Sequence, residues 1–223
     1  MKHTITINAT QFTQALKDAT LYVSKKRWDD PMNYIVLSLT DQNRKLAVIA
    51  CDGLGYYERQ LVLSNSEEAP EPSLPGKKQE LCIALTDALK ISKHITPRSD
   101  GNISISLNDT KKSNGNYLIT LTLPDRSTTT LFSNAGVNVP DYSVFVSKAE
   151  ASKENAPDLF DVSVPVHEMV RAGKVLPRKS GAVARMYTSV GHNKGHMALL
   201  EYTADDEFIR IIFMFAQNVA KAA

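Results

Sequence analysis

The sequence predicts an α+β protein of three β-α-β-β-β repeats, with the helices on one face of antiparallel sheets. A short strand pattern followed by an apolar stripe of helical spacing occurs three times. After each stripe come three short runs with strand composition. Two linker-like stretches, the proline-rich Glu67 to Lys78 and the charged Lys148 to Pro157, separate the three segments.

The first repeat begins with a predicted strand from Thr4 to Asn8 and a helix from about Gln11 to Ser24. The apolar side chains of this helix recur every three or four residues, at Phe12, Ala15, Leu16, Ala19 and Val23. The three strands that follow are predicted at Tyr34 to Thr40, Leu46 to Cys51 and Tyr57 to Leu63. An Asp-Gly pair, Asp52-Gly53, joins the last two strands, which predicts a hairpin.

The second repeat has a strand from Glu80 to Leu85 and a helix for which Thr86 is the expected N-cap. The helix stripe consists of Leu85, Ala88, Leu89, Ser92 and Ile95. Its strands are predicted at Ile103 to Leu107, Tyr117 to Leu123 and Thr128 to Ser133.

In the third repeat a strand from Phe160 to Val164 precedes Pro165, a residue suited to the start of a helix. The predicted core-facing stripe of this helix is Val166, Met169, Val170, Gly173 and Leu176. Its strands are predicted at Val183 to Thr188, His196 to Tyr202 and Phe208 to Phe215. These boundaries give a domain at residues 1–148 with repeats 1–66 and 78–148, a linker at 149–157 and a half-domain at 158–223.

Positive charge is concentrated on the predicted helices, although the net charge of the chain is only +2. The three helical segments carry eleven basic residues and three acidic ones, and the rest of the chain is net acidic. One basic layer on an acidic protein is typical of a surface that holds a polyanion by its backbone. The basic residues are Lys17, Lys25, Lys26, Arg27, Lys90, Lys93, Arg98, Arg171, Lys174, Arg178 and Lys179. The alternative is that these are ordinary solvated helix faces.

Composition places the chain among cytoplasmic proteins. It has two cysteines, Cys51 and Cys82, without the spacing of a metal or redox motif. No signal peptide or membrane-spanning run is expected, because polar residues interrupt every apolar stretch.

Three stretches, Ala50-Cys51-Asp52-Gly53, Val139-Pro140-Asp141-Tyr142 and the last strand, resemble motifs of one known family. The family is the bacterial DNA polymerase III β sliding clamp: the first stretch is similar to the Ala-Thr-Asp-Gly corner of its middle domain, and the second to the Phe-Pro-Asp-Tyr that closes that domain. The last strand, Arg210 to Phe215, is similar to the family's apolar C-terminal strand. Residues 1–148 resemble the middle domain and residues 158–216 the last half-domain, so the resemblance implies a shortened, DNA-clamp-like fold.

The resemblance also implies a pocket that receives a short partner peptide. Its expected lining is Cys51, Gly53, Leu54, Tyr56, Pro140, Val144, Phe145, Ile211 and Phe213. The alternative is that Ile211 and Phe213 are core residues of the last strand. Leu54-Gly55 replaces the usual His-Arg, and Ser143-Val144 replaces two arginines, so the positive rim of the family's pocket is missing.

Enzymatic signatures are weak. His192 and His196 have chelating spacing, but two glycines flank them and no further ligand is nearby. The adjacent acids Asp29-Asp30 and Asp205-Asp206 are typical of turns. No phosphate loop or nucleophile motif occurs, so neither an enzymatic activity nor a metal nor a cofactor is expected.

The sequence therefore predicts a processivity factor for DNA replication that encircles or cradles duplex DNA and tethers a DNA polymerase or another clamp-binding protein. A clamp loader is a further implied partner. An odd number of repeats leaves a sheet edge open, so homo-oligomers are expected. The alternative function is a clamp-derived adaptor or decoy that binds partner peptides without closing on DNA.

Overall fold

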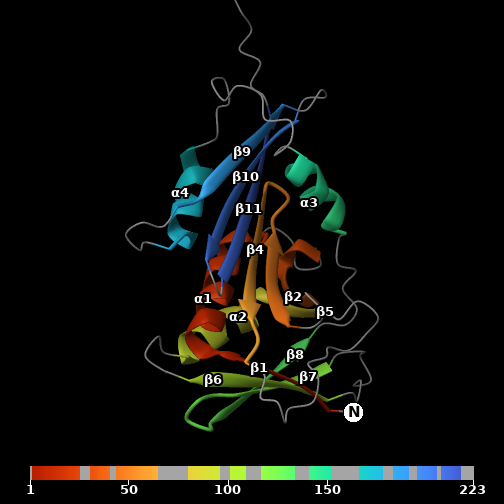
Figure 1. The fold of residues 1–223 in the computed structure, drawn as a ribbon. Coiled ribbons are helices and arrows are strands. Elements are labelled where there is room, and N and C mark those ends of the chain that lie inside the picture. Colours follow the sequence, from red (N-terminus) through yellow and green to blue (C-terminus); the bar gives the residue numbers. More distant parts are fainter. Residues whose placement is uncertain are drawn as a thin grey trace, which may run out of the picture.

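The structure is a computed structural model that describes residues 2–25, 31–40, 44–64, 80–95, 101–108, 117–133, 141–151, 166–177, 183–190, 195–204 and 207–216. It has the predicted α+β architecture, with its strands in one antiparallel 11-stranded sheet (Figure 1). The order of strands in that sheet is β1-β6-β7-β8-β5-β2-β3-β4-β11-β10-β9. The strands of the first two repeats are therefore interleaved, and those of the third repeat follow β4.

The first repeat contains β1 (Lys2–Asn8), α1 (Ala9–Ala19), β2 (Tyr34–Thr40), β3 (Lys45–Cys51) and β4 (Gly55–Val62), with short 3₁₀ turns at Thr20–Tyr22 and Pro31–Asn33. Asn8 caps α1, because its Oδ1 accepts a hydrogen bond from the backbone N–H of Gln11 at 3.0 Å. The capped helix places Phe12, Ala15, Leu16 and Ala19 against the sheet, as their spacing predicts.

The second repeat contains β5 (Glu80–Ala84), α2 (Leu85–His94), β6 (Asn102–Asn108), β7 (Tyr117–Thr122) and β8 (Thr128–Ser133). Ala84, and not Thr86, is the N-cap of α2, and its side chain makes no capping bond. The two repeats exchange their first strands: β1 pairs with β6, and β5 pairs with β2. Helices α1 and α2 pack against each other, so neither repeat is complete alone.

Of the third repeat, the structure describes α4 (Val166–Val175), β9 (Arg185–Val190), β10 (Gly195–Ala204) and β11 (Glu207–Ala216). The predicted strand at residues 160–164 lies outside the described residues. Strand β11 pairs with β4 from Glu207 opposite Leu61 to Phe213 opposite Gly55. This pairing extends the sheet of the first repeat into the third.

Side chains that alternate along the strands face two different cores. Tyr57 on β4 and Ile211 on β11 face the main core, which α1, α2 and α4 cover. Their neighbours Tyr56 and Ile212 face the opposite side, where they pack with Cys51 and Leu199 beneath α3 (Ser143–Glu150). Figure 1 shows α3 on the other side of the strands from α4.

Two features differ from the sequence-based expectation. Helix α3 was not predicted, and it runs across the proposed domain boundary at residue 148. Helix α4 is rotated: it buries Glu168, Ala172 and Val175, whereas Val166, Met169 and Val170 of the predicted core stripe are exposed. The reason is that α1 packs against α2, whereas no helix among the described residues packs against α4 in the same way.

Candidate functional site

The Asp-Gly corner between β3 and β4 is held by its own aspartate. The Asp52 Oδ1 accepts hydrogen bonds from the backbone N–H groups of Leu54, at 3.0 Å, and of Gly55, at 2.8 Å. Gly53 has φ of +88°, a conformation that favours glycine over residues with a side chain. The turn therefore has the geometry that the sequence indicates, and the second carboxylate oxygen of Asp52 points away from it.

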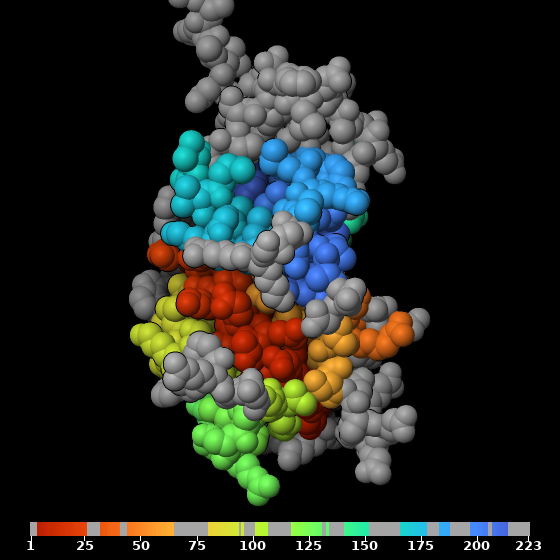
Figure 2. Space-filling view, turned by 60° about the vertical axis from the view of Figure 1, so that its left-hand side comes forward, coloured from red at the N-terminus to blue at the C-terminus, as the bar shows by residue number. Residues whose placement is uncertain are grey.

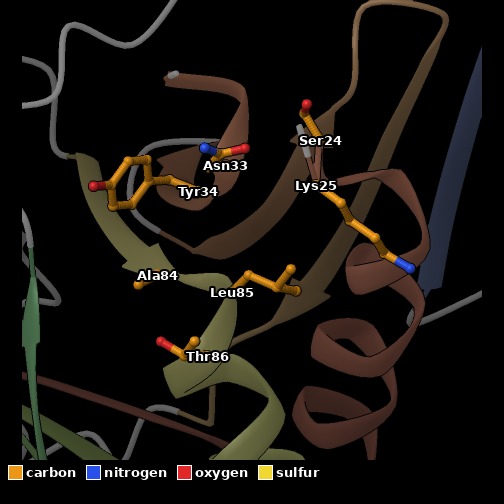
Figure 3. Close-up of a pocket in the computed structure, with 7 residues that line it drawn as sticks. All are labelled: Ser24, Lys25, Asn33, Tyr34, Ala84, Leu85 and Thr86. Atoms are coloured by element: carbon orange, nitrogen blue, oxygen red, sulfur yellow. The ribbon is translucent and has the colours of Figure 1, made fainter. Parts of the chain in front are cut away.

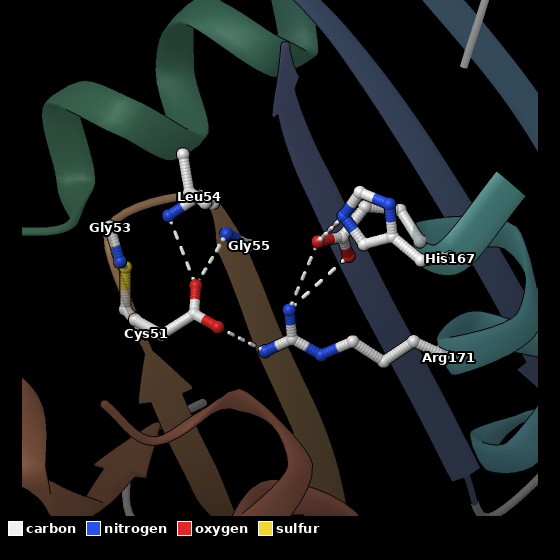
Figure 4. A network of polar contacts seen from close by, with 8 residues as sticks. Cys51, Gly53, Leu54, Gly55, His167 and Arg171 are labelled. Carbon is white, nitrogen blue, oxygen red and sulfur yellow. Dashed lines mark hydrogen bonds and ion pairs between the residues drawn. The ribbon is translucent and has the colours of Figure 1, made fainter. Parts of the chain in front are cut away.

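That second oxygen binds the third repeat. Asp52 Oδ2 accepts a hydrogen bond from Arg171 Nη2 of α4 at 2.5 Å, and Arg171 Nη1 lies 3.2 Å from Glu168 Oε1 (Figure 4). The guanidinium carbon is also 3.8 Å from the centre of the Tyr22 ring. Arg171, with 15 % of its side chain exposed, is thus engaged inside the molecule. Its assignment as a DNA-facing residue is corrected, since the rotation of α4 turns it toward the corner.

Gly55 makes this close approach possible. A Cβ atom at this position would lie 3.1 Å from Tyr22 Cδ1 and 3.2 Å from Arg171 Nη1. Both distances are tighter than ordinary van der Waals contact, so a side chain would push the ring or the guanidinium away. The glycine that departs from the clamp pattern is therefore explained by the packing of the joint between the first and third repeats.

A second ionic cluster joins the same two repeats on the helix side. Arg59 of β4 contacts Asp18 of α1 at 3.0 Å and Glu207 of β11 at 2.5 Å. Burial raises the pKa of Asp18 to about 7, although the neighbouring Arg59 opposes the shift. The carboxyl group of Asp18 therefore titrates near neutral pH.

The predicted peptide pocket is only partly assembled. Cys51 and Tyr56 are buried beneath α3, where the Tyr56 ring lies 5.8 Å from that of Phe145. Leu54 and Val144 are large apolar residues with 60 % and 55 % exposure, and Leu54 lies at the tip of the corner on the side of α3 (Figure 4). We call Leu54, Val144, Tyr142 and Phe145 the corner patch; Tyr142 and Phe145 are half-buried and pack with Tyr56.

Two predicted lining residues do not belong to this patch. Ile211 and Phe213 are fully buried in the main core, on the helix side of the sheet. Because successive side chains of a strand point to opposite faces, Ile212 is the β11 residue that packs beneath α3. The assignment of Ile211 and Phe213 is corrected, and Pro140 lies outside the described residues.

Exposed lysines lie on the helices of the opposite face. The described and exposed ones are Lys17 on α1, Lys25 after it, Lys90 and Lys93 on α2, and Lys174 on α4. Lys90 forms an exposed ion pair with Asp87 at 3.3 Å, which leaves its charge accessible. Lys26, Arg27, Arg98, Arg178 and Lys179 lie outside the described residues. The structure thus places five of the predicted basic residues on helix-side surfaces and one, Arg171, in the joint.

A cavity of about 230 Å³ opens at the start of α2 (Figure 3). Ser24, Lys25, Asn33 and Tyr34 line it together with Ala84, Leu85 and Thr86. None of its lining residues belongs to the predicted peptide pocket. The sequence carried no signal for this cavity, because its lining comes from three separate segments.

Other predicted features fall outside the described residues, namely His192, Asp29-Asp30 and Asp205-Asp206. Within the described ranges, no group of three or more His, Cys, Asp or Glu side chains could hold a metal ion. No helix among those described is both long and apolar enough to cross a membrane.

Solved sliding clamps share this fold. The DNA polymerase sliding clamp from Pseudomonas aeruginosa superposes with a TM-score of 0.63 at 13 % identity, over 96 % of this chain and 66 % of the clamp. A second structure of the Pseudomonas aeruginosa clamp, bound to griselimycin, gives a TM-score of 0.62 at 13 % identity, over 95 % and 65 % of the two chains. The DNA polymerase III subunit β from Borrelia burgdorferi gives 0.53 at 10 % identity, over 96 % and 64 %.

No protein-family model and no curated protein matches the sequence. The chain spans about two thirds of the length of the clamps that it resembles. The similarity therefore shows the clamp fold over that length.

Proposed function

We propose that this protein is a non-enzymatic, sliding-clamp-like processivity factor, which holds duplex DNA along its helix side and a partner protein on its outer side. The observation that carries the proposal is the division of the clamp fold into two faces. Exposed lysines lie on α1, α2 and α4, whereas exposed Val144 belongs to α3, across the sheet, and exposed Leu54 lies at the corner on the side of α3.

The lysines would bind DNA through its phosphates. Lys17, Lys90 and Lys93 are on helix surfaces, on long side chains that present a mobile charge without a fixed hydrogen-bond geometry. Such contacts position a duplex and carry no base sequence information. These contacts also weaken as the salt concentration rises, because counterions compete for the phosphates. Weak contacts of this kind suit a protein that moves along DNA.

A topology experiment tests whether DNA is encircled. The protein is incubated with a nicked plasmid, and the complex is separated by gel filtration before and after the plasmid is cut once. Retention that is lost on cutting supports encirclement. Equal retention on circular and linear DNA would leave cradling, and a protein that binds neither form would contradict the DNA part of the proposal.

The corner patch would receive an apolar side chain of a partner peptide. Leu54 and Val144 supply exposed apolar area, and the rings of Tyr142 and Phe145, which lie against Tyr56, supply a firm base. The patch lacks the arginines of the family's pattern, so partners with an apolar anchor and few acidic residues are favoured. Polymerases, other clamp-binding proteins and a clamp loader are the candidate partner classes.

Griselimycin, which the Pseudomonas clamp binds, is a probe for this patch. Titration calorimetry would be run on the wild type, on Leu54→Arg and on the matched control Leu89→Arg, which changes an exposed leucine of α2. We expect binding to the wild type and the control and at least tenfold weaker binding to Leu54→Arg. Equal affinity for all three proteins would remove the corner patch from the proposal.

The second candidate is an adaptor or decoy that uses the corner patch without DNA. It is favoured by the missing rim arginines and by the moderate net charge of +2. It predicts griselimycin binding together with no salt-dependent affinity for duplex DNA.

A further inference from the structure

The turn that carries Leu54, the exposed tip of the corner patch, is held by one carboxylate. Asp52 Oδ1 accepts hydrogen bonds from the backbone N–H groups of Leu54, at 3.0 Å, and of Gly55, at 2.8 Å. The backbone N–H of Asp52 donates to the carbonyl oxygen of Gly55 at 3.2 Å and closes the turn from the other side. Because Leu54 is 60 % exposed, packing contributes little to its position, and these bonds set it.

Arg171 of α4 fixes the rotamer of that carboxylate. Its Nη2 donates to Asp52 Oδ2 at 2.5 Å, while its Nη1 lies 3.2 Å and 3.3 Å from the two carboxylate oxygens of Glu168 (Figure 4). The Tyr22 ring, whose centre is 3.8 Å from the guanidinium carbon, supports one face of the guanidinium plane. The carboxylate of Asp52 therefore cannot rotate toward solvent without breaking a charge-assisted hydrogen bond.

Arg171 reaches the corner from behind and is not itself part of the corner patch. Only 15 % of its side chain is exposed, and Figure 4 shows Leu54 pointing toward α3 while Arg171 approaches from α4. Gly55 leaves the space for this approach, since a Cβ atom there would lie 3.2 Å from Arg171 Nη1. The clamp family's pattern has an arginine in place of this glycine, so the chain brings an arginine to the corner from another repeat. Figure 2 shows α4, in cyan, at the surface next to the red residues of the first repeat.

We propose that Arg171 is a positioning residue for the corner patch: it fixes Asp52, and Asp52 fixes the turn that presents Leu54 to a partner. The inference rests on the proposed partner site and adds a dependence on the third repeat. The patch binds its partner well only while α4 is docked on the first repeat. Because coupling between sites is reciprocal, a ligand on the patch should also hold α4 more firmly in place.

Hydrogen exchange of the Leu54 and Gly55 amides, followed by NMR without any ligand, is the first test. Amides of a surface turn exchange through local opening, so a uniform loss of stability does not accelerate them. In Arg171→Met both amides should exchange roughly tenfold faster than in the wild type, because Asp52 loses a bond to a charged donor. Arg171→Lys restores a positive charge and should recover part of the protection. Arg185→Met, which changes an exposed arginine of the same repeat, is the matched control and should leave both rates unchanged.

Asp52→Asn tests the same contact from its other end and removes no buried cation. An asparagine side chain has one acceptor oxygen, so it can serve either the turn or Arg171, and its NH₂ group then opposes the other donor. The variant should therefore exchange its Leu54 amide faster than the wild type. Adding Arg171→Met removes the competing guanidinium, so the double variant should exchange more slowly than Asp52→Asn alone. A general loss of packing would give the opposite order.

Griselimycin binding, measured by titration calorimetry at equal concentrations of folded protein, links the turn to the patch. We expect roughly fivefold to tenfold weaker binding to Arg171→Met than to the wild type, and unchanged binding to Arg185→Met. In the wild type, griselimycin should slow hydrogen exchange in α4, as reciprocal coupling requires.

Leu54 and Gly55 amides that exchange in Arg171→Met as slowly as in the wild type would overturn the proposal. Faster exchange with an unchanged affinity for griselimycin would overturn it as well, since the turn would then not govern the patch. A wild type that binds no griselimycin would count against the proposed partner site, whereas the exchange rates would still decide whether Arg171 positions the turn.

Discussion

Replacement of Arg171 by methionine tests how the third repeat is held to the first. The change keeps the length of the aliphatic stem and removes the charge that Asp52, Glu168 and the Tyr22 ring share. Glu168 has only 4 % side-chain exposure, so its carboxylate would lose its nearest permanent cation inside the protein.

The expected loss is large. Breaking a buried ion pair by removing one partner costs about 3–5 kcal/mol, and the partial exposure of Asp52 places this case at the lower end. Loss of the contact with Tyr22 adds about 1 kcal/mol. We therefore expect Arg171→Met to lower the free energy of unfolding by roughly 3–4 kcal/mol.

Urea unfolding of the wild type, Arg171→Met and the control Lys174→Met provides the assay. Lys174 is an exposed residue of the same helix, so its replacement should cost less than about 0.5 kcal/mol. Hydrogen exchange should show that the amides of α4 lose more protection than those of α1, because α4 is the element that Arg171 anchors. A double-mutant cycle with Asp52→Asn should give a coupling energy of about 1.5 kcal/mol. A loss of unfolding free energy no larger than that of Lys174→Met, or a coupling energy near zero, would refute the claim that Arg171 holds the third repeat to the first.

Three further predictions concern residues near the same joint. Asp18→Asn should remove part of the pH dependence of the free energy of unfolding. Burial raises the pKa of Asp18 to about 7, so this group stabilises the fold at low pH and loses that effect as pH rises toward 7. In urea unfolding, the wild type should therefore lose roughly 2–4 kcal/mol more than the variant over this pH range. The same change of stability with pH in the wild type and the variant would contradict this prediction. Phe213→Ala should lower the free energy of unfolding by about 3–5 kcal/mol, as a core residue does, without weakening griselimycin binding to the folded fraction. Gly55→Ala should cost about 1–3 kcal/mol in the same assay, and an unchanged stability would show that Tyr22 and Arg171 move aside freely.

Repetition and alternation in the sequence were sufficient to predict the fold. Strands β2 and β8 have the predicted bounds, because their runs of β-branched, aromatic and leucine residues are typical of strands. The Asp-Gly corner was also predictable, since its hydrogen bonds are made by Asp52 to residues two and three positions later. Local chemistry of this kind is visible in a single sequence.

Composition and spacing alone could not predict contacts between distant segments. The resemblance indicated one of them, between the corner and Phe145, and the ring of Tyr56 lies 5.8 Å from that of Phe145. Asp52 and Arg171 are 119 positions apart, and nothing in either neighbourhood indicates that they meet. The face that α4 buries was predicted incorrectly, because its apolar stripe is real but has no partner helix in the described chain. The buried face instead contains Glu168, whose burial depends on Arg171.

Helix α3 illustrates a different limit. Its eight residues, Ser143–Glu150, precede a charged tract and carry a weak apolar pattern. Its position depends on contacts with distant strands that no local pattern reveals. Ala149 and Phe145 pack with Leu199 and Ile212, and Arg210 Nη2 of β11 contacts Glu150 at 2.6 Å. The resemblance indicated Leu54, Val144 and Phe145 of the corner patch, whereas the helix that carries Val144 and Phe145 became visible only in the structure.

The salt dependence of duplex DNA binding tests the proposed function most directly. Lys17, Lys90 and Lys93 are exposed on the helix side, and Lys148 of α3 is exposed on the other side. The triple variant with glutamine at the first three positions should reduce the slope of log affinity against log salt concentration by about 3, because each phosphate contact contributes roughly 0.9. Lys148→Gln should leave the slope unchanged. A triple variant with the slope of the wild type would contradict the claim that the helix face holds DNA.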